Sequence, residues 1–431
     1  MLYYSTNRSS PEVNFREAAI KGQAPDKGLY FPASIPRMET TLFENIQNFP
    51  DEELAFRIIR PFVADTIPEE VLYRIVKESI DFKIPLVKVT GDFYSLELFH
   101  GPTLAFKDVG ARFMSRCLGY FLKDSKKKVT VLVATSGDTG GAVANGFAGV
   151  EGVEVVILYP SGKVSPVQEK QLTTPGGNIR AIEIDGSFDD CQSLVKQAFM
   201  DPVLNETLFL TSANSINVAR WLPQQFYYLL AYKQWPDKDH PPVISVPSGN
   251  FGNICAGLMA YAGGLPVSRF IAACNVNDVV TRYLATEKYE PYLAIPTLSN
   301  AMDVGEPSNF VRILEIFGHR FPDLGSILSS YRVTDEQTLK TIRSVSDSYG
   351  YITDPHGAVA FSALESYAIE HPGTRGIFLE TAHPVKFPDA ILQATGKQVE
   401  IPESVRSIML MTKNSTRMKV SFSHLKDFLL V

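Results

Sequence analysis

Short apolar runs alternate with longer amphipathic stretches from about residue 129 onward. The runs VTVLVA (129–134), EVVILYP (154–160) and NIRAIEI (178–184) predict buried strands, and the pattern predicts helices over 189–200 and 218–233. Further strand candidates are LFLT, PVISV, RFIAAC and GIFLET, at 208–211, 242–246, 269–274 and 376–381. Strands that alternate with helices indicate βαβ units around a parallel sheet, so the pattern predicts an α/β fold.

Two regions lack this alternation. Residues 1–95 mix helix and loop signals with closely spaced prolines, and residues 286–330 interrupt the pattern as an insertion would. We therefore expect an N-terminal subdomain over 1–95, a smaller α/β domain over 96–225 and a larger α/β domain over 226–431. These boundaries are approximate, because we expect the chain to cross between the two α/β domains.

The chain has the composition of an ordinary soluble globular protein, with 45% hydrophobic and 20% charged residues among 431. Its net charge of −6 argues against nucleic acid as a partner, which would require a basic face. The four cysteines are widely spaced and do not cluster with histidine, so we expect neither disulfides nor a metal site. Pro247 and polar residues break the uncharged segment 241–268, so we expect no membrane span and a cytoplasmic location.

Three loops rich in glycine, hydroxyl or amide groups follow predicted strands. They are TSGDTGG (135–141), SANSIN (212–217) and PSGNFGN (247–253). Parallel sheets bind ligands beyond the carboxyl ends of their strands, and backbone N–H groups at a helix start favour an anion. Each loop alone is also compatible with an ordinary capping turn, and the spacing of PSGNFGN matches neither a Walker A loop nor a dinucleotide-binding fingerprint.

A single lysine, Lys107, stands in the largely apolar stretch FHGPTLAFKDVGARF (99–113). Apolar surroundings disfavour the charged ammonium and leave a free amine that can act as a nucleophile or base. The alternative is a lysine whose stem packs on a helix while its ammonium reaches water. These residues alone leave both interpretations open.

A series of motifs, in one order along nearly the whole chain, resembles the threonine synthase family in its long-chain bacterial and fungal branch. The motifs are KGLYFP (27–32), LFHGPTLAFKD (98–108), TSGDTGGA (135–142), YPSGKVSPVQ (159–168), SANSIN (212–217), VPSGNFGN (246–253), SNAMDVGEPSNF (299–310) and TAHPVKF (381–387). The resemblance implies a pyridoxal-phosphate enzyme of fold type II, similar to the β subunit of tryptophan synthase. Parallel or mixed sheets would form two domains, and the larger domain would bind the cofactor.

The resemblance also implies roles for individual residues. Lys107 would form an imine with the cofactor, and the Thr381 hydroxyl would face the pyridine nitrogen. The cofactor phosphate would lie in a cradle made by Ser248, Gly249, Asn250, Phe251, Gly252 and Asn253. The carboxylate of the substrate would be bound by Ser136, Gly137, Asp138, Thr139 and Gly140. The amides of Asn214 and Asn217 would also contact the substrate. The candidate cations for its phosphate are Arg112, Lys163, Arg220 and Lys386. An ordinary surface ion pair is the alternative for each cation.

The reaction implied is the conversion of O-phospho-L-homoserine and water to L-threonine and phosphate, with Lys107 as the general base. Two alternatives remain: another fold-type-II lyase, such as a serine or threonine dehydratase, and a catalytically silent homologue that binds a phosphorylated amino acid. Related enzymes often carry Asn where this chain has Asp138. An ionised Asp cannot donate a hydrogen bond to the phenolic oxygen of the cofactor, so the role of Asp138 stays open.

Overall fold

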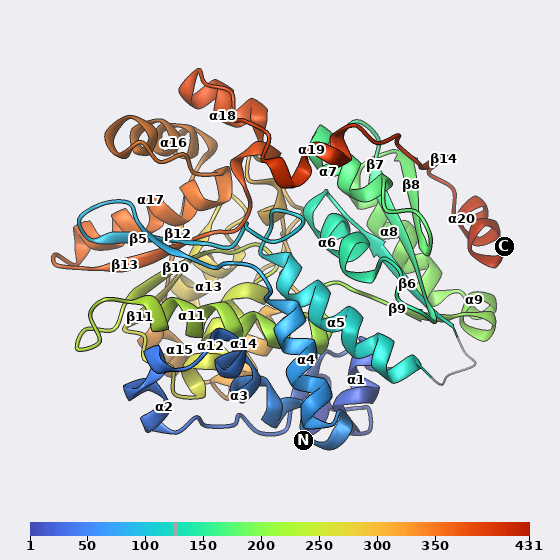
Figure 1. Cartoon of the computed structure of the whole chain (residues 1–431), viewed down its shortest axis with the longest axis horizontal. Coiled ribbons are helices and arrows are strands. Elements are labelled where there is room, and N and C mark those ends of the chain that lie inside the picture. The colour runs from blue at the N-terminus through green and yellow to red at the C-terminus, as the bar shows by residue number, and fades with distance from the viewer. Residues whose placement is uncertain (124–127) are drawn as a thin grey trace.

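A six-stranded sheet and a five-stranded sheet lie side by side in the computed structural model, which describes residues 1–123 and 128–431 (Figure 1). The six-stranded sheet has the order β12-β11-β10-β13-β5-β4, and its strands are parallel except for β4, which runs antiparallel to β5. Its strands are β4 (Leu86–Lys88), β5 (Phe93–Glu97), β10 (Val243–Pro247), β11 (Arg269–Cys274), β12 (Leu328–Arg332) and β13 (Gly376–Glu380). The α/β fold predicted from the pattern is confirmed.

The five-stranded sheet is parallel throughout, in the order β14-β8-β7-β6-β9. Its strands are β6 (Val129–Ala134), β7 (Val153–Pro160), β8 (Ile179–Asp185), β9 (Phe209–Thr211) and β14 (Thr416–Lys419). All six residues of β6 are buried, because helices cover both faces of the sheet. A strand buried on both faces has a continuous apolar sequence, as VTVLVA does.

The N-terminal part adds a small antiparallel sheet and helices that lie against the two larger units. The sheet has the order β2-β1-β3, formed by β1 (Leu2–Ser5), β2 (Val13–Asn14) and β3 (Tyr30–Pro32). The helices are α1 (Phe15–Lys21), α2 (Thr40–Glu44), η1 (Ile46–Asn48), α3 (Asp51–Val63), η2 (Ala64–Thr66) and α4 (Glu69–Ser79). Figure 1 shows them below the six-stranded sheet and α5, where α3 packs on α11 and α4 packs on α5.

The remaining helices surround the two sheets. Those that follow or cover strands of the five-stranded sheet are α5 (Lys107–Leu122), α6 (Asp138–Phe147), α7 (Pro166–Thr173), α8 (Phe188–Met200), α9 (Pro202–Thr207), α19 (Glu403–Met409) and α20 (Phe422–Leu430). The others are α10 (Val218–Trp221), η3 (Leu222–Gln224), α11 (Gln225–Gln234), α12 (Gly252–Ala262), α13 (Val279–Thr286), η4 (Asn300–Met302), α14 (Phe310–Ile316), α15 (Phe321–Ile327), α16 (Asp335–Tyr349), α17 (Pro355–Glu370), η5 (Pro384–Lys386) and α18 (Pro388–Thr395). Across the described ranges, no helix is both long enough and apolar enough to span a bilayer.

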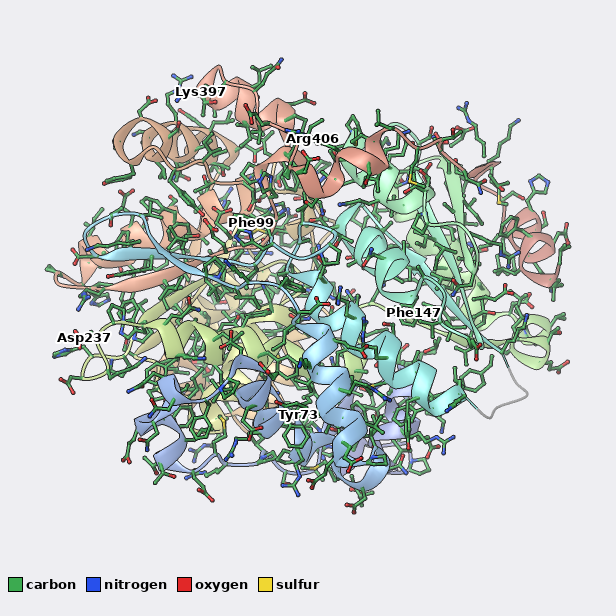
Figure 2. All side chains as sticks on the ribbon, viewed as in Figure 1. Tyr73, Phe99, Phe147, Asp237, Lys397 and Arg406 are labelled. Carbon is green, nitrogen blue, oxygen red and sulfur yellow. The ribbon has the colours of Figure 1, made fainter. Side chains whose placement is uncertain are left out.

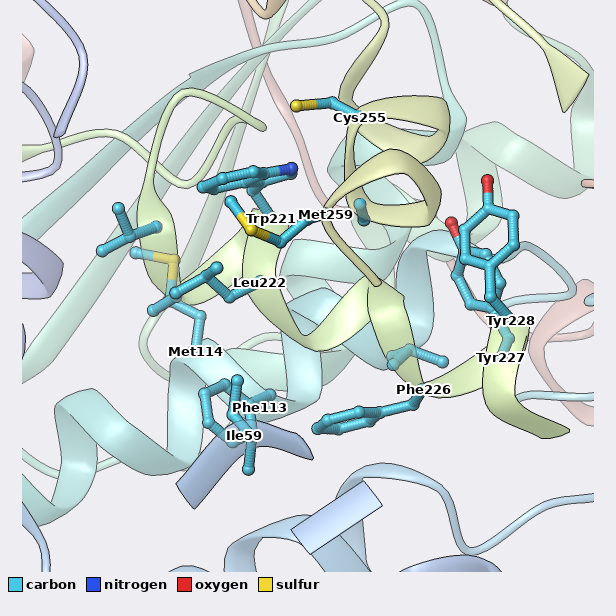
Figure 3. Close-up of a cluster of buried hydrophobic side chains, with 14 of the residues drawn as sticks. Ile59, Phe113, Met114, Trp221, Leu222, Phe226, Tyr227, Tyr228, Cys255 and Met259 are labelled. Atoms are coloured by element: carbon cyan, nitrogen blue, oxygen red, sulfur yellow. The ribbon is translucent and has the colours of Figure 1, made fainter. Parts of the chain in front are cut away.

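A core of large side chains lies between α5, the α10–α11 segment and α12 (Figure 3). Phe113 of α5, Trp221 of α10 and Met259 of α12 are all fully buried there. Burying a side chain of this size contributes about 1.5–3 kcal/mol. The hydroxyl of Tyr228 also donates to Asn253 O over 2.9 Å, so the core supports both α5 and the loop before α12. Figure 2 labels Lys397, which by contrast is an exposed residue.

Three strands do not follow the ranges predicted for the domains, and the first is β4, which lies in 1–95 but pairs within the six-stranded sheet. Strand β5 belongs to the six-stranded sheet although the boundary at residues 95 and 96 divides it, and β14 joins the five-stranded sheet although it lies in 226–431. Both sheets are built from separate parts of the chain, and the approximate domain boundaries stay a prediction. The region 286–330, predicted as an insertion, contributes the start of edge strand β12, and the helix predicted over 218–233 is divided by η3 at Pro223.

Candidate functional site

Lys107 is the first residue of α5, and 16% of its side chain is exposed. Just before it, Leu104 adopts a left-handed φ of 57°. Phe106 N then donates to Thr381 O over 2.9 Å, and Thr381 itself directly follows β13. The structure therefore brings Lys107 to the carboxyl end of the central strand of the six-stranded sheet, next to Thr381.

Asp108 fixes the loop that carries Lys107. This buried carboxylate accepts from Thr103 N over 2.9 Å and also from the Thr103 hydroxyl. A Cβ on Gly101 would lie 2.5 Å from Asp108 Oδ2, so only glycine fits where the loop passes the carboxylate. Asp108 is thus a structural acid, and its contacts hold the start of α5 in place.

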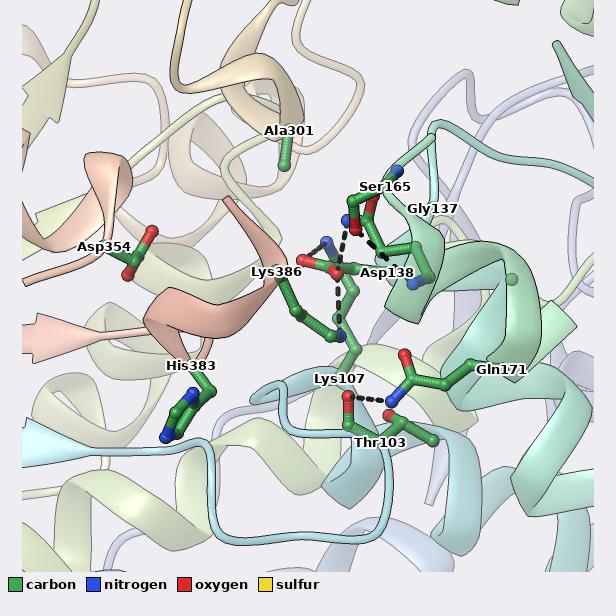
Figure 4. A network of polar contacts seen from close by, with 12 residues as sticks. Thr103, Lys107, Gly137, Asp138, Ser165, Gln171, Ala301, Asp354, His383 and Lys386 are labelled. Carbon is green, nitrogen blue, oxygen red and sulfur yellow. Dashed lines mark hydrogen bonds and ion pairs between the residues drawn. The ribbon is translucent and has the colours of Figure 1, made fainter. Parts of the chain in front are cut away.

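Asp138 lies between two lysines at the centre of the site (Figure 4). Its Oδ1 atom accepts from Lys386 Nζ over 2.8 Å and from Gln168 Nε2 over 2.9 Å, and its Oδ2 atom lies 3.7 Å from Lys107 Nζ. Burial would raise the pKa of Asp138, but Lys386 and Lys107 outweigh it and hold the pKa far below the usual range. Asp138 is therefore an ionised carboxylate and an acceptor.

Burial is also the main influence on Lys107, and it lowers the pKa of the amine. Asp138 opposes this effect, whereas the nearby cations Lys386 and Arg220 add to it. The start of α5 acts in the same direction, because a helix N-terminus carries partial positive charge. Of the two interpretations left open by the sequence, the structure favours the amine held in a poorly solvated place.

The loop after β6 presents backbone N–H groups. Thr135 Oγ1 accepts from Gly137 N over 3.0 Å and from Gly140 N over 2.9 Å, which fixes the turn. No acceptor for the N–H groups of Ser136, Asp138 or Thr139 is found among the described residues. Gly137 has a φ of 134°, and a Cβ there would lie 2.6 Å from Nε2 of the residue 168 side chain. The turn fits a small carboxylate at the start of α6.

The loop before α12 has the properties of a phosphate cradle. In the described structure, no protein acceptor is found for the backbone N–H groups of residues 249–253. All but one of these five residues are buried, and Phe251 adopts a left-handed φ of 61°. Buried N–H groups without acceptors are costly, and at a helix start they are suited to a dianion. The loop therefore fits the phosphate of the expected cofactor.

A second segment presses on this cradle from outside. A Cβ on Gly249 would lie 2.5 Å from Met302 Cα, so η4 packs directly on the loop. Ala301 N donates to His356 Nε2 over 3.2 Å, and His356 Nδ1 lies 2.5 Å from Asp354 Oδ1. The buried pair of Asp354 and His356 thus positions η4 against the cradle.

Arg220 is a buried cation near Lys107. Only 3% of the Arg220 surface is exposed, and neither its Nε nor its Nη1 has a hydrogen-bond partner among the described residues. Burial lowers the pKa of Arg220 to about 10, with Asp108 opposing it. A Cβ on Gly110 would lie 2.4 Å from Arg220 O, so the close contact of α5 and α10 fixes this residue near Lys107. An unpaired buried guanidinium costs several kcal/mol, which indicates a place built for an anion.

The amides of the 212–217 loop differ in their availability. Asn214 Oδ1 is buried and has no partner in the described part of the chain. Asn217 is fully engaged, since its Oδ1 caps α10 at Ala219 N and its Nδ2 donates to Ala19 O over 2.8 Å. Asn214 therefore remains free to bind a ligand, whereas Asn217 holds the loop.

Two of the predicted cations are not brought to Lys107. Arg112 lies one turn further along α5 and donates to Glu78 O and to Asp81 on the opposite side, toward α4. Lys163 is exposed in the loop after β7. The sequence shows that a cation is present at each of these two positions, but the direction of its side chain depends on which neighbouring element packs against it.

The sequence analysis did not single out Arg312, His356 or Gln168. Arg312 is fully buried and donates to Tyr30 O, Ser215 O and Ile216 O, so it shapes the 212–217 loop. Its position two residues after the SNAMDVGEPSNF motif was the available signal. Gln168 ends the YPSGKVSPVQ motif, whereas His356 lies in no motif.

Comparisons with known proteins agree along the whole chain. Three family models match: pyridoxal-phosphate dependent enzyme over residues 84–379, threonine synthase N terminus over 2–80, and threonine synthase, C-terminal over 357–429. The chain is similar to the threonine synthase of Serratia marcescens, with 44% identity over 431 residues, 100% of this chain and 99% of that relative.

Solved structures give the same result. The structure is similar to that of threonine synthase from Escherichia coli, with a TM-score of 0.92 and 43% identity, covering 100% of this chain and 99% of that one. It is also similar to the PLP-bound threonine synthase from Brucella melitensis, with a TM-score of 0.93 and 35% identity over 100% of this chain and 99% of that one.

Proposed function

The chain belongs to the threonine synthase family of pyridoxal-phosphate-dependent enzymes, and from this premise we propose that it converts O-phospho-L-homoserine and water to L-threonine and phosphate. One observation carries the choice of substrate: Arg220 is a buried cation whose Nε and Nη1 lack partners in the described structure. This reaction handles a second phosphate besides that of the cofactor, and a guanidinium binds phosphate through two parallel N–H donors. Substrates of the rival dehydratases carry no phosphate.

We assign the cofactor contacts to three parts of the site. Pyridoxal phosphate, when bound, supplies an aldehyde for a lysine amine and a ring that withdraws electrons from the substrate. Lys107 is the linked amine, and the backbone N–H groups of residues 249–253 hold the phosphate. The Thr381 hydroxyl would face the ring nitrogen, and this neutral partner would leave the nitrogen less protonated than a carboxylate would.

The substrate is held at both ends in this arrangement. Its α-carboxylate accepts from the backbone N–H groups of Ser136, Asp138 and Thr139, which lack acceptors among the described residues. Its phosphate lies against Arg220, with Asn214 beside the same loop. Gly137 and Gly140 take part through the backbone turn that they permit.

Lys107 then acts as the general base. With the substrate amine in its place on the cofactor, Lys107 Nζ would be a free amine in a site that disfavours the charged form. It would take a proton from the α-carbon, release that proton to another atom of the bound substrate and cofactor, and then take a proton from the β-carbon. Phosphate would leave from the γ-carbon while Arg220 balances its charge, and water would add its hydroxyl at the β-carbon. The two protons taken earlier would return to the α- and γ-carbons, and the remaining proton of the water would leave with the phosphate. The Asp108 contacts keep Lys107 at the distance that both proton transfers require.

The test is a product assay with O-phosphohomoserine on protein reconstituted with pyridoxal phosphate, and Lys107→Ala serves as the matched blank. We expect threonine and phosphate in equal amounts from the wild-type protein. Formation of 2-oxobutyrate and phosphate would mean that water addition does not occur and would favour a dehydratase-like reaction. A protein that holds its cofactor yet forms neither product would favour the silent homologue.

We also propose that the enzyme acts in the cytoplasm on this small-molecule substrate, without nucleic acid or membrane partners. The buried, free thiols of Cys117, Cys191, Cys255 and Cys274 support a reducing compartment. The net charge of −6 offers no basic face for nucleic acid.

A further inference from the structure

Asp138 and Lys386 form a buried ion pair that joins the two halves of the site. Lys386 Nζ donates to Asp138 Oδ1 over 2.8 Å, and 0% of the Lys386 side chain is exposed. Asp138 begins α6, after the five-stranded sheet, and Lys386 ends η5, after the six-stranded sheet. Figure 4 shows the two side chains meeting next to Lys107.

The hydrogen bonds of Lys386 are incomplete. An ammonium has three N–H donors, and Asp138 Oδ1 is the one acceptor found for Lys386 Nζ in the described part of the chain. A fully buried charge needs further acceptors to offset its desolvation, and a buried ion pair alone contributes little to stability. The pair is therefore poorly explained as a device for folding, and the ammonium is available to another acceptor.

The chemistry of the cofactor supplies such an acceptor. In pyridoxal phosphate the phenolic oxygen is on the ring carbon next to the one that bears the aldehyde. When Lys107 carries the cofactor, that oxygen must lie beside Lys107 Nζ, and the Asp138 carboxylate is 3.7 Å from this nitrogen. Ionised Asp138 cannot donate to the phenolic oxygen and would repel its anionic form. A donor is needed on this side, and Lys386 is the ammonium next to Asp138.

We propose that Lys386 donates a hydrogen bond to the phenolic oxygen of bound pyridoxal phosphate, and that Asp138 holds Lys386 in position for this contact. The inference rests on the proposed linkage of the cofactor to Lys107. The motif resemblance implied that Lys386 binds the substrate phosphate, whereas in this proposal Lys386 binds the cofactor. The substrate phosphate is then bound by Arg220. Asp138 also gains a role that does not require its carboxylate to donate.

The absorption spectrum of the holoenzyme tests this directly. A hydrogen bond donated by an ammonium stabilises the phenolate form of the cofactor relative to the uncharged form. The phenolate form absorbs near the visible, and the uncharged form absorbs in the ultraviolet. We expect Lys386→Met to lower the ratio of the two bands at least about tenfold, the effect of losing one charge-assisted hydrogen bond. The affinity for pyridoxal phosphate, measured by titration, should fall as well.

Two double variants keep the test decisive if Lys386→Met does not fold, because both remove the whole ion pair. Asp138→Asn with Lys386→Met places an amide donor at position 138, whereas Asp138→Leu with Lys386→Met places an apolar group of similar size there. We expect the phenolate band to return only in the Asn version. Equal spectra for the two versions would overturn the proposal.

A different result would also overturn it. If Lys386→Met keeps the wild-type spectrum but raises the KM for O-phosphohomoserine, then Lys386 binds the substrate phosphate. A wild-type protein without any near-visible band would instead contradict the linkage at Lys107, and with it the proposed function itself.

Discussion

Replacement of Arg220 by Met should raise the stability of the protein and lower its activity. Among the described residues, the buried Arg220 has no hydrogen-bond partner for Nε or Nη1, so the enzyme without substrate holds a charge that is poorly compensated. Methionine has a similar length and no charge, and exchange of a buried charged group for a well-packed apolar one commonly stabilises by about 1–4 kcal/mol. Substrate binding and turnover should fall, because the phosphate loses its guanidinium.

The size of the loss follows from the two free donors. Each charge-assisted hydrogen bond is worth about 1.5–3 kcal/mol, so two correspond to a fall of about 10²–10⁴-fold in kcat/KM. Arg312 provides the matched control, because it is equally buried but donates to Tyr30 O, Ser215 O, Ile216 O and Asn309 Oδ1. Arg312→Met leaves these acceptors unsatisfied and should destabilise the protein by at least about 3 kcal/mol.

Urea unfolding of the holoenzyme without substrate, together with steady-state kinetics on O-phosphohomoserine, measures both effects. Inorganic phosphate should raise the unfolding midpoint of the wild-type protein and leave that of Arg220→Met unchanged. The reasoning is refuted if Arg220→Met is destabilised as much as Arg312→Met, or if its kcat/KM stays within tenfold of wild type.

Three further perturbations address other parts of the site. Lys107→Ala should remove the near-visible absorption of the bound cofactor, and an unchanged spectrum would contradict the assignment of Lys107. Gly249→Ala places a Cβ 2.5 Å from Met302 Cα and should weaken cofactor binding by about 1–3 kcal/mol in titrations. Gly325→Ala is the control, because a Cβ there meets no described atom within 4 Å. Equal cofactor affinities of the two variants would argue against the cradle. Burial lowers the pKa of His383 from 6.5 to about 4, so the unfolded chain binds more protons between these values and stability falls as the pH drops through them. His383→Asn should flatten the pH dependence of the urea midpoint in that window, and an unaltered slope would show that His383 does not cause it.

The strands that the sequence predicted best are those buried on both faces. The apolar runs at 129–134 and 269–274 match β6 and β11 at both ends, because helices on each side leave no polar face to interrupt the pattern. Three edge strands, β4, β12 and β14, were not predicted, whereas the edge strand β9 matches the predicted run LFLT within one residue. Strand β14 has one buried residue among TRMK, and its place in the five-stranded sheet depends on contacts with β8 that no local pattern contains.

The candidate site divides in a similar way. Motif order predicted which residues cluster, since Lys107, Asp138 and Lys386 do meet in space. It did not predict which arginine is free. Arg220 and Arg312 are both buried cations near motifs. Three backbone carbonyls from distant segments and Asn309 Oδ1 accept from Arg312, whereas Nε and Nη1 of Arg220 have no acceptor among the described residues.

The central position of β13 has a consequence for synthesis on the ribosome. Strand β5 ends at residue 97, and its neighbour in the sheet, β13, begins at residue 376. At about 5–20 residues per second, β5 waits roughly 15–60 s for this partner, with its edge able to pair with other chains. Strand β8 waits in the same way for β14. Lys107 therefore emerges early into an unfinished nascent chain, and its site is completed only when the last quarter of the protein has been translated.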